Sequence, residues 1–447
     1  MKQFLKKLIP KDRILLYHRV LSWLAAAWEG FPSRRLVVIG VTGTRGKSTT
    51  SYLIAKALEA GGACVGLTST VYFKIGEREW LNDTKMTMLG RFRLQRMLRD
   101  MVRSGCTHAV IETSSEGILQ SRHRGINYDV AVFTNLSREH LEAHGGFEAY
   151  KHAKQELFVQ LMNKPHKGAQ KKISIVNLDS PYAMDFSSIP ADERWGFGQH
   201  PAPQEFRGQV ILVSQPQCDL NGCRFEVNGI PFHLQLLGAF NIANAAAAVT
   251  VGLALGFPLE KMRKAFARLT LMPGRMERIV EGQPFQVMVD YAHDEASFEA
   301  LFEAVKMMKF QRVIHVFGSA GGVRDHAKRP VLGRLSGTHA DFLVITNEDC
   351  WDEDPQKIIR EIKAGAFSVG KKEGETLFCV EDRGEGIRKG LSLAGSNDLV
   401  LITGKGTEQF IVYAPNERKG WDDRTVTRRV LQEMGYRAVD NMRKEKE

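Results

Sequence analysis

The sequence has few cysteines, no internal repeats and no long apolar run. None of its six cysteines forms a Cys-x-x-Cys pair and no His/Cys cluster has zinc-site spacing, which excludes a structural zinc site and a disulfide framework. We therefore expect reduced, mostly buried thiols, as in a cytoplasmic protein, at Cys64, Cys106, Cys218, Cys223, Cys350 and Cys379. The absence of an apolar segment of spanning length excludes a polytopic membrane protein.

Proline and acidic residues are also scarce relative to glycine and basic residues. The chain has 15 prolines against 41 glycines, a ratio that suits an α/β protein with many tight strand-to-helix turns. Its 51 acidic residues face 62 basic ones, and the resulting net charge of +11 favours an anionic partner such as a nucleotide, nucleic acid or anionic lipid. A hydrophobic fraction of 43% excludes a disordered chain, and 447 residues suffice for two or three domains.

Residues 1–35 are both basic and apolar. His18, Arg19 and Glu29 interrupt the apolar stretch, which argues against a signal peptide and a spanning helix. We expect a basic amphipathic helix that docks through residues 1–30 on the protein's own body or on a protein partner, with a membrane surface as the alternative. Its apolar positions are Leu15, Leu16, Val20, Leu21, Trp23, Leu24 and Trp28.

From residue 36 onward, apolar strands alternate with helical patterns. Strands at 36–40, 109–112, 130–134 and 173–177, with a helix over 48–60, indicate βαβ units and a parallel sheet. A small antiparallel section over 209–236 and an alanine-rich helix over 243–255 follow, and a second series of strands begins at 286. We predict an α/β protein with a P-loop central ATPase domain of mostly parallel sheet over 36–271. A Rossmann-like α/β C-terminal domain follows over 272–447.

The strongest local motif is the glycine-rich segment Gly40-Val-Thr-Gly-Thr-Arg-Gly-Lys-Ser48, which joins a strand to a helix. Backbone N–H groups of such a turn, together with the helix N-terminus, form a cradle for phosphate oxygens. The lysine would neutralise the β- and γ-phosphates, and the serine hydroxyl would bind Mg²⁺. The strict motif requires glycine where Val41 stands. The predicted nucleotide-binding residues of this loop are Gly43, Thr44, Arg45, Gly46, Lys47, Ser48 and Thr49.

Carboxylate and imidazole side chains follow two further strands. Glu112 ends one predicted strand, and His140 follows the next one along the chain. Because the carboxyl ends of parallel strands meet at the crevice where ligands bind, both residues are candidate Mg²⁺ ligands.

These segments, in order and spacing, resemble the Mur ligases, and most of all the UDP-N-acetylmuramoyl-tripeptide synthetase (MurE) type. The resemblance covers residues 36 to about 430. It is carried by the phosphate loop and by the segments that begin at Glu112, Thr134, Ala153, Leu237, Gly274, Val289 and Gly404. It implies an ATP-dependent, ADP-forming amide ligase of peptidoglycan precursor synthesis, which joins an amino acid to a UDP-MurNAc-peptide-like acceptor through an acyl phosphate. A cytoplasmic enzyme that binds no nucleic acid is expected.

The resemblance also implies roles for residues. Lys154 matches the family lysine that reacts with CO₂ to form a carbamate, and it would serve two Mg²⁺ ions together with Ser48, Glu112 and His140. The expected catalytic residues are Lys47, Glu112, His140 and Lys154. For ATP, Asn241 and Asn244 would face the adenine, Asp290 the ribose, and Arg275 and His293 the phosphates. The acceptor would lie against Thr87, Ser115, Gln120 and Arg122, and the amino acid against Arg324, Asp349, Trp351, Gly404 and Glu408.

Three departures from the family pattern qualify these expectations. Trp351 stands where diaminopimelate enzymes have a carboxylate-binding arginine, so lysine or another amino acid is favoured. Glu116 stands where the family has histidine. Only 35 residues precede the first strand, so we expect the usual N-terminal UDP-binding domain to be lacking.

Two other functions remain open from the sequence. A poly-γ-glutamate or folylpolyglutamate type of amide ligase shares the ATPase motifs. A non-catalytic nucleotide-binding switch or membrane scaffold would explain the phosphate loop and the basic N-terminus, but not Lys154, His140 and the asparagine pair together.

Overall fold

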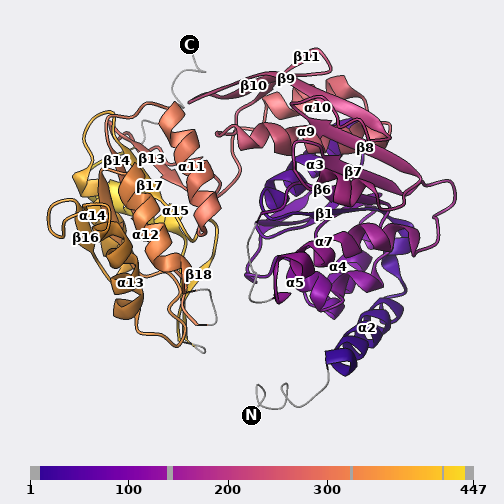
Figure 1. Ribbon diagram of the computed structural model, residues 1–447, viewed down its shortest axis with the longest axis horizontal. Coiled ribbons are helices and arrows are strands. Elements are labelled where there is room, and N and C mark those ends of the chain that lie inside the picture. The colour runs from indigo at the N-terminus through magenta and orange to yellow at the C-terminus, as the bar shows by residue number, and fades with distance from the viewer. Residues whose placement is uncertain (1–10, 138–143, 323–325, 415–416, 438–447) are drawn as a thin grey trace. The chain divides into compact units, whose positions relative to one another are not determined.

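The computed structural model describes residues 11–137, 144–322, 326–414 and 417–437 (Figure 1). The chain forms two compact units. The first runs up to Cys218 and takes in Gly222–Gln235 and Ala239–Thr270, and the second comprises Asp219–Asn221, Leu236–Gly238 and the chain from Leu271 onward.

The first unit is built on a sheet of 11 strands in the order β11-β10-β9-β8-β7-β6-β1-β5-β2-β3-β4. Strands β2 and β5–β9 extend the sheet on both sides of β1 in parallel pairs, and β3 and β4 add antiparallel edge strands. The bounds are β1 Val37–Thr42, β2 Val65–Thr68, β3 Tyr72–Ile75, β4 Arg78–Leu81, β5 His108–Glu112, β6 Val130–Phe133, β7 Ile173–Asn177, β8 Glu193–Gly198, β9 Gln209–Asp219, β10 Gly222–Val227 and β11 Ile230–Leu234.

Helices cover both faces of this sheet (Figure 1). On one face lie α4 (Arg91–Arg103), α5 (Ser115–Leu119), α7 (Phe147–Met162) and α8 (Ala183–Ser187), whose apolar residues join those of β1, β5 and β6 in one core. The other face carries α3 (Lys47–Gly61), α9 (Phe240–Ala254) and α10 (Leu259–Ala267). Burial on both faces explains why the central strands are continuous apolar runs.

The second unit is a six-stranded sheet in the order β12-β13-β17-β14-β15-β16, parallel except for β12. Its strands are β12 Glu277–Arg278, β13 Gln286–Val289, β14 Val313–Phe317, β15 Phe342–Ile345, β16 Leu377–Cys379 and β17 Leu399–Ile402. Helices α11 (Glu295–Met307), α12 (Lys328–His339) and α13 (Pro355–Phe367) share one core with the sheet, and α14 (Arg383–Leu393) and α15 (Asp423–Glu433) share the other. A hairpin of β18 (Phe410–Ala414) and β19 (Glu417–Gly420) completes the unit.

The predicted α/β class and the two predominantly parallel sheets are confirmed. The antiparallel section expected over 209–236 is not a separate sheet, because β9 pairs in parallel with β8 and joins the hairpin of β10 and β11 to the main sheet.

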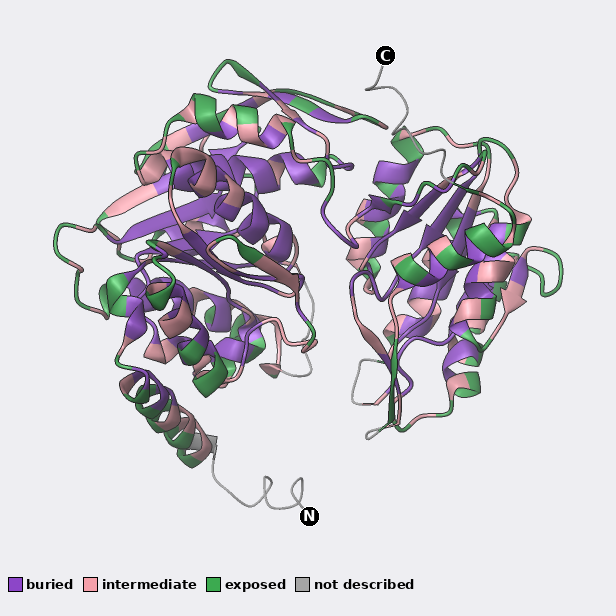
Figure 2. Cartoon of the chain, turned by 180° about the vertical axis from the view of Figure 1, so that it is seen from behind, coloured by how far each residue is buried: buried purple, intermediate pink, exposed green. Residues whose placement is uncertain are grey.

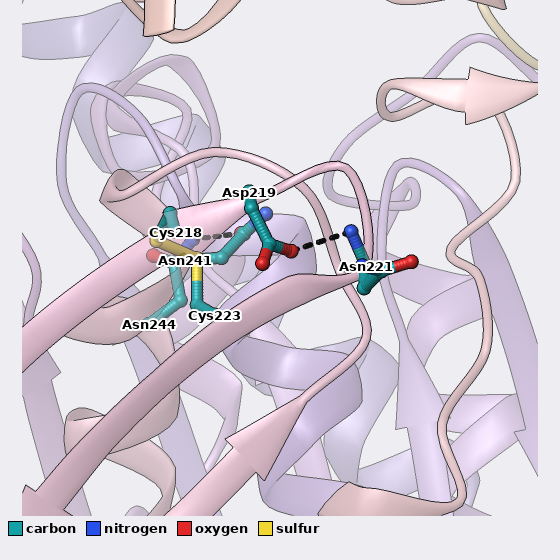
Figure 3. The surroundings of a disulfide bond; sticks show 6 residues. All are labelled: Cys218, Asp219, Asn221, Cys223, Asn241 and Asn244. Atoms are coloured by element: carbon teal, nitrogen blue, oxygen red, sulfur yellow. Dashed lines mark hydrogen bonds between the residues drawn. A yellow bond between two sulfur atoms is a disulfide. The ribbon is translucent and has the colours of Figure 1, made fainter. Parts of the chain in front are cut away.

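The expectation of six reduced cysteines is wrong for one pair. Cys218 and Cys223 form a disulfide, with their Cα atoms 4.1 Å apart (Figure 3). The turn between β9 and β10 brings the two residues opposite each other on neighbouring strands, although they are only five positions apart. Cys64, Cys106, Cys350 and Cys379 are free thiols.

The expected N-terminal helix is present as α2 (Lys11–Trp28). Five of its apolar residues, Leu16, Val20, Trp23, Leu24 and Trp28, are exposed to solvent, so these side chains do not pack on the first unit. The residues that face the protein body are small, because the helix lies close to α4 and to the 3₁₀ helix η2 (Arg122–Gly125). A second 3₁₀ helix, η1 (Pro32–Arg35), connects α2 to β1. Within the ranges given above, no helix is both long and apolar enough to cross a bilayer.

One buried histidine of the second unit connects β14 to helix α12 and to the residue that follows β17. His315 of β14 lies between the hydroxyls of Ser336 and Thr403, at 3.0 and 2.9 Å from its ring nitrogens. Burial, reinforced by the nearby cation of Arg383, lowers the pKa of His315 to about 3. The neutral ring is therefore the native form.

This neutral histidine predicts a loss of stability in acid. Between pH 6.5 and about 3 the unfolded chain binds a proton at His315 that the folded chain does not. Within this range, His315 therefore lowers the free energy of unfolding by about 1.4 kcal/mol for each unit by which the pH falls. The variant His315→Gln keeps a donor and an acceptor, and its melting temperature should fall less steeply with decreasing pH. The exposed His339→Gln is the control. Equal pH slopes for His315→Gln and the unaltered chain would contradict the assignment.

Candidate active site

The glycine-rich segment forms a tight turn between β1 and α3. Gly43 and Gly46 have φ of 155° and 76°, a backbone region that favours glycine. A Cβ atom at Gly43 would lie 2.0 Å from Thr134 Oγ1, and one at Gly46 would lie 2.3 Å from Asn244 Oδ1. Both glycines are therefore required by close packing as well as by conformation.

The loop is held from the side by the segment that follows β6. The backbone N–H groups of Thr44 and Arg45 each donate to Asn135, at 2.9 Å, and Thr134 Oγ1 donates to the Arg45 carbonyl at 2.8 Å. Lys47 Nζ donates to the Thr44 carbonyl at 2.7 Å. These contacts fix the loop, and Ser48 and Thr49 are buried in the first turn of α3, directly behind it. This is the arrangement in which a helix N-terminus binds phosphate.

The asparagine pair expected at the adenine lies on the first turns of α9. Asn244 Nδ2 donates to Asn241 Oδ1 at 2.9 Å, and Thr50 Oγ1 donates to Asn244 Oδ1 at 3.0 Å. Figure 3 shows the pair in the surroundings of the Cys218–Cys223 disulfide. Asn244 thus connects α9 to the phosphate loop and its helix.

Glu112 lies at the end of β5, and its side chain is buried. Its two carboxylate oxygens accept hydrogen bonds from Thr70, one from the backbone N–H at 2.7 Å and one from the hydroxyl at 3.0 Å. The Thr70 hydroxyl is also 3.0 Å from the hydroxyl of Thr87. Glu112 and Thr87 are therefore joined through Thr70, which sequence reasoning missed, although it follows a strand that neighbours β5.

Lys154 is buried on α7 with its ammonium against the phosphate loop. Its Nζ donates to the Gly43 carbonyl at 2.6 Å and lies 4.4 Å from the centre of the Tyr150 ring. His144 stacks edge-on against the same ring and lies 3.1 Å from Ser115 Oγ. Burial lowers the pKa of His144, and the Lys154 cation lowers it further. His144 is a second residue that sequence reasoning missed, four positions after His140.

The residues expected at the acceptor lie beside α5. Arg122 Nη2 donates to Gln120 Oε1 at 2.7 Å, and its other terminal nitrogen donates to the Met88 carbonyl. Arg91, at the start of α4, donates to the Gln120 carbonyl. Burial lowers the pKa of Arg122, and the neighbouring Arg91 cation lowers it further. Two guanidinium groups thus lie close together, and Arg91 is an anion-binding candidate that the sequence did not single out.

Two residues expected at the site, His140 and Arg324, lie outside the described residues. Of the others, the residues of the phosphate loop, Glu112, Lys154, the acceptor residues and the asparagine pair all lie in the first unit. Arg275, Asp290, His293, Asp349, Trp351, Gly404 and Glu408 lie in the second unit.

The residues of the second unit that are expected to bind the nucleotide lie near the carboxyl end of β13. Asp290 is buried at the end of β13 and accepts from the backbone N–H groups of Met276 and Ala292, at 2.8 and 2.7 Å. Burial raises the pKa of Asp290, although the Arg275 cation opposes the shift. The Arg275 guanidinium lies 4.4 Å from the Tyr291 ring centre, and His293 Nδ1 donates to the Tyr291 carbonyl at 2.8 Å.

An acidic cluster surrounds the buried Lys405. Its Nζ donates to Asp349 Oδ1 at 2.9 Å and to Glu408 Oε2 at 2.6 Å. Burial alone would lower the pKa of Lys405, but Glu408, Asp349 and Glu348 together raise it above its ordinary value. The ammonium is therefore permanent, and three carboxylates share one fixed cation.

Glu348 is the carboxylate of this cluster that sequence reasoning left without a role. It is buried in the loop that follows β15, and its Oε2 has no hydrogen-bond partner among the described residues. A Cβ atom at Gly404 would lie 2.6 Å from this oxygen, so the glycine makes room for it. Trp351, three residues further on, has a left-handed φ of 57° and is partly exposed.

Comparison with known proteins assigns the family. The Mur ligase middle domain matches residues 41–252, and the Mur ligase, glutamate ligase domain matches residues 274–406. A UDP-N-acetylmuramyl-tripeptide synthetase of Roseiflexus sp. (strain RS-1) is 43% identical over 440 residues, 96% of this chain and 85% of the relative. A UDP-N-acetylmuramoyl-L-alanyl-D-glutamate–2,6-diaminopimelate ligase of Geobacillus kaustophilus (strain HTA426) is 35% identical over 424 residues, 93% of this chain and 83% of the relative.

A solved structure gives the same result. The structure of a UDP-N-acetylmuramoyl-L-alanyl-D-glutamate–2,6-diaminopimelate ligase matches with a TM-score of 0.59 and 29% identity, over 90% of this chain and 79% of that one. The chain belongs to the Mur ligase family, and it is an ATP-dependent ligase of the MurE type.

The packing of Gly46 predicts a selective loss of nucleotide binding. In Gly46→Ala the new methyl group would collide with Asn244 and force the loop out of place, so the Kd for ATP should rise about tenfold or more, since strain and a displaced loop cost at least about 1.4 kcal/mol. Gly62→Ala is the matched control, because Gly62 ends the same helix with φ of 104° but has nothing within 4 Å of the added Cβ. Isothermal titration calorimetry measures both variants. Equal Kd values in the two would contradict the assigned packing.

Proposed function

We propose that this ligase joins an amino acid to UDP-MurNAc-dipeptide, and that the contact between Lys154 and the phosphate loop is the centre of its catalytic site. The single observation that carries the proposal is the 2.6 Å hydrogen bond from the buried Lys154 ammonium to the Gly43 carbonyl. Through this hydrogen bond the Lys154 side chain contacts the loop that would hold the transferred phosphate. The ligase adds its amino acid during peptidoglycan synthesis.

The reaction has two bond-forming steps. The acceptor carboxylate takes the γ-phosphoryl group of ATP, which forms an acyl phosphate and releases ADP. The amine of the incoming amino acid then attacks the acyl carbon, the new C–N bond forms, and inorganic phosphate and a proton leave. Both steps concentrate negative charge on phosphate oxygens, so the fixed N–H groups of the loop and the cation of Lys47 would stabilise them without reorganisation.

We also propose that Lys154 acts as a carbamate. The lone pair of the neutral amine would attack the carbon of CO₂, forming an N–C bond and releasing one proton. The product carries anionic oxygens in place of a cation. Glu112 supports this role, because both its described hydrogen bonds come from the uncharged Thr70, which leaves the carboxylate charge for a cation.

The proposed Mg²⁺ ions would be held by Ser48, Glu112 and the Lys154 carbamate, together with His140, which lies outside the described residues. Mg²⁺ prefers oxygen ligands, which the carbamate, the Glu112 carboxylate, the Ser48 hydroxyl and the phosphate oxygens would supply. When bound, Mg²⁺ would neutralise charge on the transferred phosphoryl group.

The acidic cluster supports a diamino acid whose far end carries an ammonium and no carboxylate. Lys405 satisfies Asp349 and Glu408, whereas Glu348 Oε2 remains for a second cation. Trp351 has no charge to bind a distal carboxylate. We therefore propose lysine over diaminopimelate, with Arg324 and Glu408 at the matching family positions for the α-carboxylate and an amine.

The domain roles are part of the same proposal. Residues 36–271 would bind ATP and the acceptor, and residues 272–447 would bind the amino acid. The division of the chain between Thr270 and Leu271 supports this assignment. A cytoplasmic location follows from the use of ATP and a UDP-linked precursor.

Replacing Lys154 tests the catalytic centre. Lys154→Ala should lower amino-acid-dependent phosphate release about 100-fold or more, in line with the loss of one preorganised electrostatic group. Added formate or acetate should restore part of it by replacing the carbamate oxygens. Lys151→Ala is the control, because Lys151 lies on the same helix but pairs with Glu148 at 2.9 Å. Unreduced turnover in Lys154→Ala would sink the proposal, and ¹³C-bicarbonate NMR of the unaltered chain would detect the carbamate directly.

Amino-acid choice is tested with phosphate release in the presence of ATP, Mg²⁺ and UDP-MurNAc-dipeptide. Lysine should support faster release than diaminopimelate. Trp351→Arg should shift the ratio of kcat/KM toward diaminopimelate by about tenfold, since a charged hydrogen bond contributes about 1.5–3 kcal/mol. Trp351→Phe keeps an uncharged ring and should leave the ratio unchanged. A preference of the unaltered enzyme for diaminopimelate would refute this choice of substrate.

A further inference from the structure

The outer face of α2 exposes an unusual set of large apolar side chains, and Figure 2 shows exposed residues along this helix. Trp28 is 80% exposed, Leu16 and Tyr17 are each 60% exposed, and Trp23 is 59% exposed. We call this the outer face of α2, and its members are Leu16, Tyr17, Val20, Trp23, Leu24 and Trp28. At 3.6 residues per turn, positions 16, 20, 23 and 24 fall along one side of the helix, so the apolar surface is continuous.

The opposite face fixes the helix to the first unit. Ala25 and Ala26 are fully buried, and Ser22 Oγ donates to the Ser121 carbonyl at 2.6 Å. Glu29 is buried and pairs with Arg99 of α4. A surface helix ordinarily buries its large apolar residues and exposes its small and polar ones. Here the arrangement is reversed, so the helix is anchored by small residues while its largest apolar side chains face outward.

The charge of the segment that carries this face is mostly positive. Residues 1–35 contain eight basic residues (Lys2, Lys6, Lys7, Lys11, Arg13, Arg19, Arg34 and Arg35) against two acidic ones, Asp12 and Glu29. Four of the basic residues are exposed: Arg13, Arg19, Arg34 and Arg35. Glu29, in contrast, is buried and paired with Arg99. Arg93 and Arg96 of α4, the helix against which α2 packs, are exposed as well.

We propose that the outer face of α2 lies flat on an anionic lipid bilayer. Tryptophan and tyrosine prefer the interface between headgroups and acyl chains, leucine and valine enter the acyl boundary, and the exposed arginines described above would bind anionic headgroups. A second copy of the chain is a poorer occupant, because docking two such faces would bring two sets of positive charges together. The helix is not apolar enough to span the bilayer.

The position of α2 gives this surface a consequence for the ligase. Ser121, which accepts the hydrogen bond from Ser22, lies between Gln120 and Arg122, two residues expected at the acceptor. Tyr17 lies near enough to Arg91 to influence its pKa. Membrane contact would thus hold the acceptor-binding edge of the first unit close to the bilayer surface.

Vesicle flotation of the full chain, without substrate, tests the proposal independently of the ligase activity. The chain should float with vesicles of phosphatidylglycerol and phosphatidylcholine, with a blue shift of tryptophan emission, and bind less to phosphatidylcholine alone and at high salt. The double variant Trp23→Ala/Trp28→Ala should bind the anionic vesicles at least about tenfold more weakly than the unaltered chain. Met307→Ala/Phe367→Ala is the matched control, since it removes exposed apolar side chains from the second unit.

Three results would overturn the proposal. These are no flotation with anionic vesicles, equal flotation of the Trp23→Ala/Trp28→Ala variant, and a concentration-dependent dimer in sedimentation that this variant abolishes. The last result would assign the face to a second copy of the chain. Phosphate release by the variant with soluble substrates should match that of the unaltered chain, which shows that the variant is folded.

Discussion

The close approach of Gly43 to its neighbours is the contact on which the proposed catalytic centre depends. Its Cα passes so near Thr134 that no Cβ fits, and its carbonyl accepts the Lys154 hydrogen bond at 2.6 Å. One residue therefore joins the loop after β1, the segment after β6 and helix α7. Because these three elements come from separate parts of the chain, the site can form only once the parallel sheet has assembled. The fold and the chemistry are coupled at this glycine.

The candidate site residues of the two units favour ligands of opposite charge. In the first unit, backbone dipoles and the cations of Lys47, Arg91 and Arg122 favour phosphate and carboxylate. In the acidic cluster of the second unit, three carboxylates share the single cation of Lys405. The Oε2 atom of Glu348 has no hydrogen-bond partner among the described residues and favours an ammonium. A ligase needs both, since it joins an activated carboxyl group to an amine. Under the proposed function, the cations of the first unit would bind the acceptor and ATP, and the carboxylates of the acidic cluster would bind the amine.

The local elements were largely predictable from the sequence, because burial on both faces of the sheets produces continuous apolar strands and the glycine-rich turn has a specific chemical pattern. The missed features depend on contacts between distant segments. Thr70 holds Glu112 only because β2 and β5 are neighbours in the sheet, and Arg91 meets Arg122 only because α4 packs beside η2. The disulfide was missed for a different reason. Its cysteines become neighbours through a hairpin turn, and counting cysteines does not detect that geometry.

The net charge of +11 illustrates why composition alone cannot identify a partner. Much of the charge inside the units is compensated locally: Arg383 pairs with Asp423, Arg329 with Glu353 and Glu361, and Lys405 with two carboxylates. The first 35 residues, in contrast, carry eight basic side chains and two acidic ones, so more than half of the excess arises there. Among the described residues of this segment, the exposed Arg13 and Arg19 lie on the same helix as the exposed Tyr17, Trp23 and Trp28. The excess charge of this segment therefore calls for an anionic surface of its own, separate from the nucleotide.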